Sequence, residues 1–338
     1  MRAKFTLALL AVLLGGALNA AQFRAEDKVA EEYKPYMQSW AVDFSDANLR
    51  ATAKKRQDEL AASTMQPTAS LIAPANGEQP AVPLYLYRGK NAPQLSPLIY
   101  FIHGGGYLMG NAKSKGARLM QLANELNATV ASVEYRLSSV APFPADLNDA
   151  YNGLKYLFEN AKSLGLDRRK VVVMGESAGG GLAARLALYA RDKGELSLAG
   201  QVLVYPMLDH RTGGADSIYD DKNTGEFVWT AAANVAGWTA LRGGQAISEE
   251  QMPYFSPALA KNLRGLPQVF MVTGELDLFV HEDIDYANRL LANGVSTELL
   301  VIPNVFHSFD SVNENSPQTK LYFKLRNEAI ERMFKAAK

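Results

Sequence analysis

The sequence predicts an α/β protein whose β-sheet is mainly parallel and carries helices on both faces. Short apolar segments rich in branched side chains alternate along the chain with longer segments of helical spacing. Such alternation requires crossover connections, and these place helices on both faces of a parallel sheet. The chain has 338 residues, 48% of them apolar, which is enough for one large domain with an accessory cap and a sizeable core.

The strands and longer helices are expected from residue 70 onward. They follow a polar segment, 22–65, in which apolar spacings of three and four suggest short amphipathic helices. The expected strands are 70–73, 82–87, 96–102, 128–135, 171–173, 200–207, 268–273 and 296–302. The expected helices are 114–127, 146–163, 180–189, 230–241, 283–293 and 318–337. Pro74–Gly77 marks a turn between the first two strands, and Gly165 and Gly294 mark helix ends.

The N-terminus has the pattern of a signal peptide, expected to comprise residues 1–20. Arg2 and Lys4 precede an apolar run, Phe5–Leu14, and small residues at 17–21 suit cleavage. The alternative, an uncleaved membrane anchor, calls for a longer apolar run. We therefore expect a periplasmic or secreted protein without a membrane segment after cleavage.

Composition excludes several kinds of chemistry. The chain has no cysteine, so it has no disulfide, no thiol nucleophile and no cysteine-based zinc site. Lys+Arg and Asp+Glu both number 35, so no net charge favours a nucleic acid partner. We expect neither a metal nor an organic cofactor. Neither the oligomeric state nor the natural substrate can be read from the sequence.

The central motif is Gly175-Glu176-Ser177-Ala178-Gly179, which lies between an apolar strand and a small-residue helix. This strand–turn–helix arrangement is typical of a nucleophile elbow. The serine lies in a strained turn, so the positions two residues away cannot carry bulky side chains. The helix that follows directs its free N–H groups and positive dipole end toward charge that develops at the serine.

A serine nucleophile needs a base, and the chain offers only four histidines. His307 follows the last strand, and loops at the carboxyl ends of parallel strands converge on one site. His210 opens a long insertion and is expected to be a surface residue, and His281 is expected to be solvated or capping a helix. His103 precedes three glycines directly after a strand, which is typical of an oxyanion loop.

The acid that orients the base is expected after the penultimate strand. Asp277 has this position, while Glu275 lies too close to the strand end and Asp283 lies inside the next helix. The order along the chain is therefore Ser177, Asp277 and His307, which is the order of α/β-hydrolases.

The chain resembles the hormone-sensitive-lipase-like carboxylesterases, a group of α/β-hydrolases, over roughly residues 97–309. The resemblance rests on several spaced motifs in the family's order. They are His103-Gly-Gly-Gly-Tyr107, Tyr135-Arg-Leu137, Pro142-Phe-Pro-Ala145, Gly175-Glu-Ser-Ala-Gly-Gly180, Ser256-Pro257, Asp277 and His307-Ser-Phe309.

The resemblance implies an α/β-hydrolase fold with a helical cap and a role for each site residue. Ser177 would be the nucleophile, His307 the general base and acid, and Asp277 its partner. The amides of Gly105, Gly106 and Ala178 would form the oxyanion hole, with Gly104 shaping the loop and His103 bracing it. The cap would comprise an N-terminal segment, 21–67, and an insertion, 210–254, on a catalytic domain of 68–338, although the first segment also fits a simple N-terminal arm.

The implied activity is hydrolysis of short- to medium-chain acyl esters by a serine carboxylesterase. Four aromatic residues are candidates for lining the acyl pocket, and core packing explains each equally well: Tyr107, Phe227, Trp229 and Trp238. The sequence departs from the family at Glu176, where Asp is commoner, at Leu278, where Pro is usual, and at 138–141, which lacks the usual Pro-Glu-His.

Two alternatives remain open at this point. The same triad would also serve a deacetylase of sugars or of other small esters and amides. A non-catalytic binding protein on a hydrolase scaffold is the alternative from another class, and it normally lacks a triad member.

Overall fold

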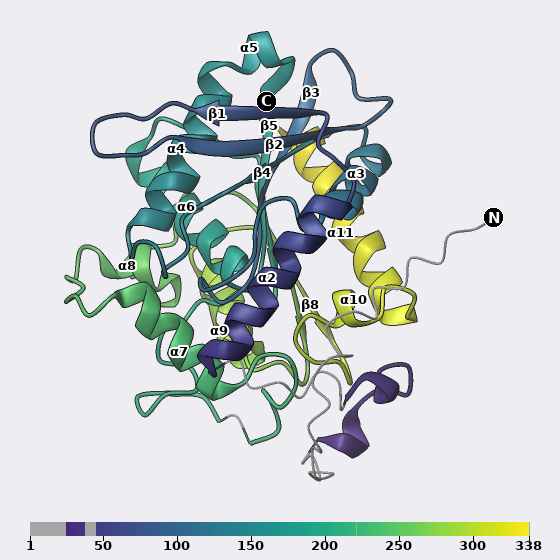
Figure 1. The fold of residues 1–338 in the computed structure, drawn as a ribbon, viewed down its shortest axis with the longest axis vertical. Coiled ribbons are helices and arrows are strands. Elements are labelled where there is room, and N and C mark those ends of the chain that lie inside the picture. Colours follow the sequence, from purple (N-terminus) through teal and green to yellow (C-terminus); the bar gives the residue numbers. More distant parts are fainter. Residues whose placement is uncertain (1–24, 38–44, 221, 338) are drawn as a thin grey trace.

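The computed structural model describes residues 25–37, 45–220 and 222–337. Its centre is one 8-stranded sheet with the strand order β1-β2-β4-β3-β5-β6-β7-β8. The pairs β1–β2 and β2–β4 are antiparallel, and all later pairs are parallel. Helices cover both faces of this twisted sheet (Figure 1). The prediction of an α/β fold with a mainly parallel sheet is confirmed.

The strands lie close to their expected positions. They are β1 (Ala69–Ala73), β2 (Val82–Arg88), β3 (Ser96–Ile102), β4 (Thr129–Val133), β5 (Leu166–Glu176), β6 (Gly200–Val204), β7 (Val269–Gly274) and β8 (Thr297–Ile302). The longer helices are α2 (Ala47–Ser63), α3 (Gly116–Glu125), α4 (Ala145–Glu159), α6 (Ala178–Lys193), α7 (Ala231–Arg242), α9 (Val280–Ala292) and α11 (Pro317–Ala336).

Shorter elements connect them: α5 (Ala161–Leu164), α8 (Met252–Phe255), α10 (Phe309–Val312) and the 3₁₀ turns η1 (Glu26–Lys28), η2 (Lys34–Tyr36) and η3 (Pro257–Leu259). The sequence did not predict α8, α10 or η3, because single turns leave no clear periodicity. The helix expected at 146–163 is split into α4 and α5, and it ends at Gly165 with φ 64° as expected.

Two cores lie on opposite faces of the sheet because successive strand residues point in opposite directions. In β3, Leu98, Tyr100 and Ile102 belong to one core, together with residues of α4, α6 and α9, while Ile99 and Phe101 belong to the other, together with residues of α3 and α11. Every residue of β3 except Pro97 is buried. This explains why the strand reads as a continuous apolar run in the sequence.

The N-terminal part of the described chain packs against two regions near the carboxyl ends of the strands. Tyr33 Oη lies 2.7 Å from Ser316 Oγ, and its ring packs edge-on against Phe306. On α2, which forms one helix rather than the expected short ones, Asp58 accepts a hydrogen bond from Asn111. Figure 1 shows α2 crossing in front of the sheet. The assignment of 21–67 to a cap remains a prediction.

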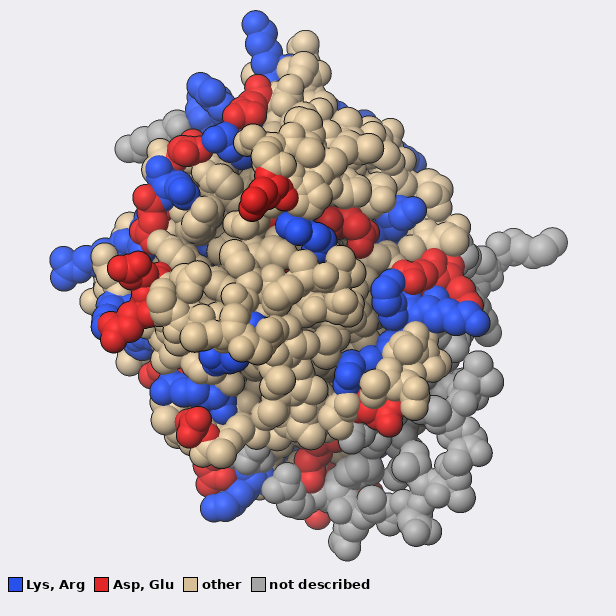
Figure 2. Space-filling view, turned by 60° about the vertical axis from the view of Figure 1, so that its left-hand side comes forward, with Lys and Arg blue, Asp and Glu red and all other residues tan. Residues whose placement is uncertain are grey.

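The predicted signal peptide, 1–20, lies outside the described residues. In the part of the chain that the structure describes, no helix combines the length and apolarity needed to cross a bilayer. Figure 2 shows acidic and basic side chains interspersed around a broad uncharged area. The face seen there therefore has no extended region of one charge.

Candidate active site

Ser177 lies at the sharp turn between β5 and α6, as the motif predicts. Its backbone has φ 57° and ψ −123°, a strained conformation for a residue other than glycine. A Cβ atom on Gly175 would lie 2.0 Å from the Gly179 carbonyl oxygen, and one on Gly179 would lie 2.2 Å from the Ile102 carbonyl oxygen. Both glycines are therefore required by close backbone contact around the serine.

The structure brings Ser177, His307 and Asp277 together at the carboxyl ends of β5, β8 and β7. The Nε2 atom of His307 lies 2.9 Å from Ser177 Oγ, and its Nδ1 atom lies 2.7 Å from Asp277 Oδ2. Asp277 is fully buried, and its second oxygen accepts a hydrogen bond of 3.0 Å from the Phe279 amide. This geometry can transfer a proton from the serine to the imidazole.

Neither rival carboxylate forms a hydrogen bond with His307. Glu275 is exposed and accepts a hydrogen bond of 2.9 Å from the Asn304 amide. Asp283 lies inside α9, fully buried, and burial raises its pKa well above the ordinary value. Asp277 is thus the acid that meets His307.

Two aromatic rings hold the imidazole of His307 from its sides. The ring of Tyr205 lies 4.7 Å away at 65°, and that of Phe279 lies 5.3 Å away at 88°. His307 itself is only 3% exposed. Such edge-to-face packing restricts the tilt of the imidazole and shields it from water.

The glycine loop after β3 lies directly beside Ser177. A Cβ atom on Gly104 would lie 3.2 Å from Ser177 Cβ, so this loop approaches the serine closely. Gly105 and Gly106 have φ of 123° and 61°, conformations that L-residues rarely adopt. Among the described residues, no hydrogen bond uses the amide of Gly105, Gly106 or Ala178. Their use as an oxyanion hole remains a prediction.

His103 lies within this loop but does not contact Ser177 Oγ. Its ring stacks 4.4 Å from that of Tyr135, whose hydroxyl donates to the His103 carbonyl over 2.9 Å. Its Nδ1 lies 2.9 Å from the Gly104 carbonyl oxygen. Burial lowers the pKa of His103 to about 4, so the ring is neutral at physiological pH. These contacts suit the predicted bracing role.

The remaining histidines lie apart from the triad. His210 is half-buried, with its ring 5.5 Å from Phe255, and burial lowers its pKa. It was expected at the surface, but the insertion folds back over it. His281 is exposed in the first turn of α9, as expected.

The four aromatic candidates for the acyl pocket are all buried within the protein. Trp229 lies against the glycine loop after β3, because a Cβ on Gly106 would lie 2.0 Å from its ring. Trp238 lies 5.6 Å from Tyr107, and Phe227 lies 4.9 Å from Phe306. Their role toward a substrate remains a prediction.

Sequence reasoning did not identify four residues that surround the site. Tyr205 and Phe279 pack against His307, Asp310 accepts a hydrogen bond from Tyr205, and Arg118 pairs with Asp310. The sequence signal for Tyr205 was its place at the end of β6, directly before Pro206. Arg118 is an ordinary helix residue in the sequence, and only the fold shows its partner. In the regions that the structure describes, no cluster of three or more histidine, aspartate or glutamate side chains is arranged to hold a metal ion.

The sequence matches the model of a family described as having the α/β-hydrolase fold over residues 99–311. It is 34% identical to the carboxylesterase NlhH of Mycobacterium tuberculosis, over 63% of this chain and 66% of that protein. It is 30% identical to an ethyl acetate hydrolase of Pseudomonas putida, over 68% of this chain and 71% of that one.

Solved structures show the same similarity across nearly the whole chain. A bacterial heroin esterase superposes with a TM-score of 0.84 at 32% identity, covering 91% of this chain and 99% of its own.

Proposed function

The chain belongs to the hormone-sensitive-lipase-like carboxylesterases of the α/β-hydrolase fold, and we propose that it works through a covalent acyl-enzyme on Ser177. As a member it is a carboxylic ester hydrolase. The observation that carries the proposal is the continuous chain of contacts from Asp277 through His307 to Ser177, of 2.7 and 2.9 Å.

Acylation begins when Ser177 Oγ attacks the ester carbonyl carbon and its proton passes to His307 Nε2. Asp277 accepts the Nδ1 hydrogen of His307, so the Nε2 lone pair faces the serine. The oxyanion that forms would lie against the free amides of Gly105, Gly106 and Ala178. Each such donor typically contributes about 3 kcal/mol to lowering the barrier.

The tetrahedral intermediate collapses when His307 returns the proton to the leaving alcohol oxygen and the ester C–O bond breaks. Water then attacks the acyl-enzyme while His307 takes its proton. The bond between the acyl carbon and Ser177 Oγ then breaks, His307 returns the proton to Oγ, and the carboxylic acid is released. Each cycle therefore converts one ester and one water into one acid and one alcohol, and the protein is unchanged.

We propose acyl chains of short to medium length. The supporting feature is Trp229 of the 210–254 insertion, which lies against Gly106 and limits the space above the oxyanion loop. The relative from Pseudomonas putida is named for ethyl acetate, an ester with a short acyl group. We also propose export to the periplasm or the medium, on the composition of residues 1–20 alone.

The experiment is a panel of p-nitrophenyl esters from acetate to palmitate, together with acetylated sugars, assayed with wild type and Ser177→Ala. We expect activity to peak at short chains and to fall by about 10⁴-fold or more in the variant. A fluorophosphonate should label the wild type once per chain and leave the variant unlabelled. Full activity in Ser177→Ala would refute the site, and rising activity toward palmitate would refute the size preference.

A further inference from the structure

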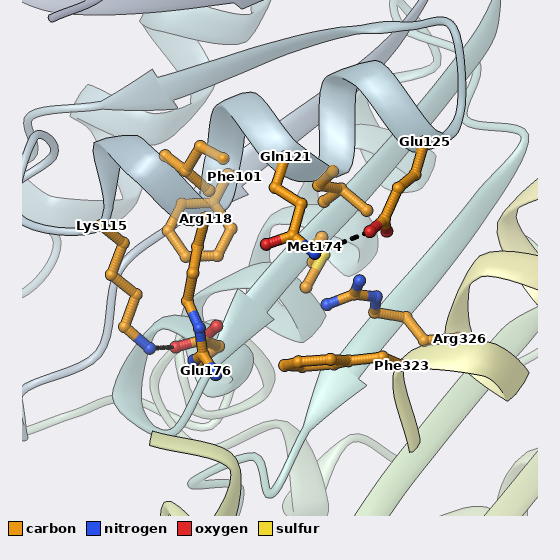
Figure 3. Close-up of a pocket in the computed structure, with 11 residues that line it drawn as sticks. Phe101, Lys115, Arg118, Gln121, Glu125, Met174, Glu176, Phe323 and Arg326 are labelled. Carbon is orange, nitrogen blue, oxygen red and sulfur yellow. Dashed lines mark hydrogen bonds and ion pairs between the residues drawn. The ribbon is translucent and has the colours of Figure 1, made fainter. Parts of the chain in front are cut away.

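Two basic side chains at the start of helix α3 reach the segments that carry Ser177 and His307. Lys115, directly before the helix, forms an ion pair with Glu176, the residue before Ser177. Arg118, one turn later, pairs with Asp310, three residues after His307. Figure 3 shows both side chains extending from α3 toward the end of β5, where Glu176 lies.

The Asp310 side of its contact with Arg118 is nearly closed to water, while Arg118 is half-buried. Arg118 Nη1 lies 3.0 Å from Asp310 Oδ2, and Nη2 donates to the Asp310 carbonyl over 2.7 Å. The Asp310 side chain is 1% exposed. Burial by itself would raise its pKa, but the charges of Arg118 and Lys115 outweigh this and hold the pKa below its usual value. Asp310 is therefore a buried carboxylate.

The other oxygen of Asp310 connects this pair to the catalytic base. Tyr205 donates its hydroxyl hydrogen to Asp310 Oδ1 over 2.7 Å. The ring of the same tyrosine packs against the imidazole of His307 at 4.7 Å. Contacts thus run without interruption from Arg118 through Asp310 and Tyr205 to His307.

The fold explains why such a connection is useful. Ser177 follows β5 and His307 follows β8, and two strands, β6 and β7, lie between them in the sheet. The sheet ladder therefore does not join the two loops directly, although their side chains must meet at 2.9 Å. One helix that binds both loops can fix their separation.

We propose that Arg118 is a positioning residue for ester hydrolysis, which acts through Asp310 and Tyr205 to fix the imidazole of His307 against Ser177. Lys115 fixes the other partner of this contact, Ser177, through its ion pair with the preceding residue, Glu176. This inference rests on the proposed function of the triad. Stability and kcat distinguish this role from a purely structural one. A buried ion pair often contributes little net stability, whereas a misplaced base lowers kcat.

The first test uses Tyr205→Phe, which removes only the hydroxyl and keeps the ring. The second uses Arg118→Met combined with Asp310→Asn, which removes both charges so that neither remains buried without a partner. Each variant is assayed with p-nitrophenyl acetate, and its melting temperature is measured. We expect kcat to fall about tenfold for the first and about a hundredfold for the second, with KM unchanged within about twofold.

Asp167→Asn is the matched control. Asp167 is 9% exposed on its side chain and pairs with Arg169 at the opposite end of β5, so its loss should leave kcat unchanged. Wild-type kcat in the folded double variant and in Tyr205→Phe would overturn the inference, even if the melting temperature fell. If the wild type itself fails to hydrolyse any ester or to react with a fluorophosphonate, the proposed function fails instead.

Discussion

Asp277 Oδ2 lies 2.7 Å from the Nδ1 atom of His307, although the two residues come from different loops, after β7 and after β8. Strands β7 and β8 are parallel neighbours, paired from Val269 with Thr297 to Gly274 with Ile302. Their register places the two loops side by side at one edge of the sheet. The orientation of the base is thus a direct consequence of strand pairing.

The carboxylate of Asp277 should therefore be needed for catalysis, and that of Glu275 should not. We expect Asp277→Asn to lower kcat by about 10⁴-fold, because the amide favours the wrong imidazole tautomer. Glu275→Gln, two residues away, should retain most of the activity. Steady-state kinetics of the two variants measure this, and comparable losses in both would contradict the assignment.

Gly106 should tolerate no side chain. A Cβ atom would lie 2.0 Å from the Trp229 ring at φ 61°, and relieving that contact would move an oxyanion donor. We expect Gly106→Ala to lower kcat by about a hundredfold or more. Gly194→Ala is the control for backbone strain alone, since its φ is 68° and nothing lies within 4 Å of the added atom. Near wild-type kcat in Gly106→Ala would argue against this oxyanion loop.

His103 should make the protein less stable in mild acid. Its folded-state pKa is about 4 against 6.5 for the unfolded chain, so between these values the unfolded state binds more protons. Stability is then lost as the pH falls from 6.5 toward 4. Between pH 7 and pH 5 we expect wild type to lose about 2 kcal/mol more than His103→Gln, measured by urea unfolding at each pH. Parallel losses in the two proteins would show that His103 is not the group responsible.

Arg185 and Asp146 form an ion pair in which both side chains are almost fully buried, at 0% and 1% exposure. The guanidinium also lies 5.0 Å from the ring of Tyr107. Arg185→Met leaves a buried carboxylate without a partner and should lower the free energy of unfolding by about 3–5 kcal/mol. Arg185→Met combined with Asp146→Leu should recover most of that loss. Denaturant titration measures both, and a double variant as unstable as the single one would show that packing dominates.

The sequence alone determined the fold class, the positions of the strands along the chain and the three residues, Ser177, Asp277 and His307, whose side chains the structure brings into contact. It could do so because each of these features has a local pattern in the sequence. Buried strands appear as apolar runs, and the elbow appears as glycines at fixed spacing around a serine. The base and the acid are polar residues that directly follow strands. Helix ends at Gly165 and the glycine loop after β3 followed from the same local rules.

Tertiary structure alone decided which side chains support the triad. Arg118 and Asp310 are 192 positions apart in the sequence, and neither lies in a recognisable motif, yet their side chains meet at 3.0 Å. Likewise, Trp229 comes to lie over Gly106 only when the insertion folds back. Such contacts depend on how helices and loops pack in three dimensions. Periodicity in the sequence indicates which face of an element is buried, but not which residues meet there.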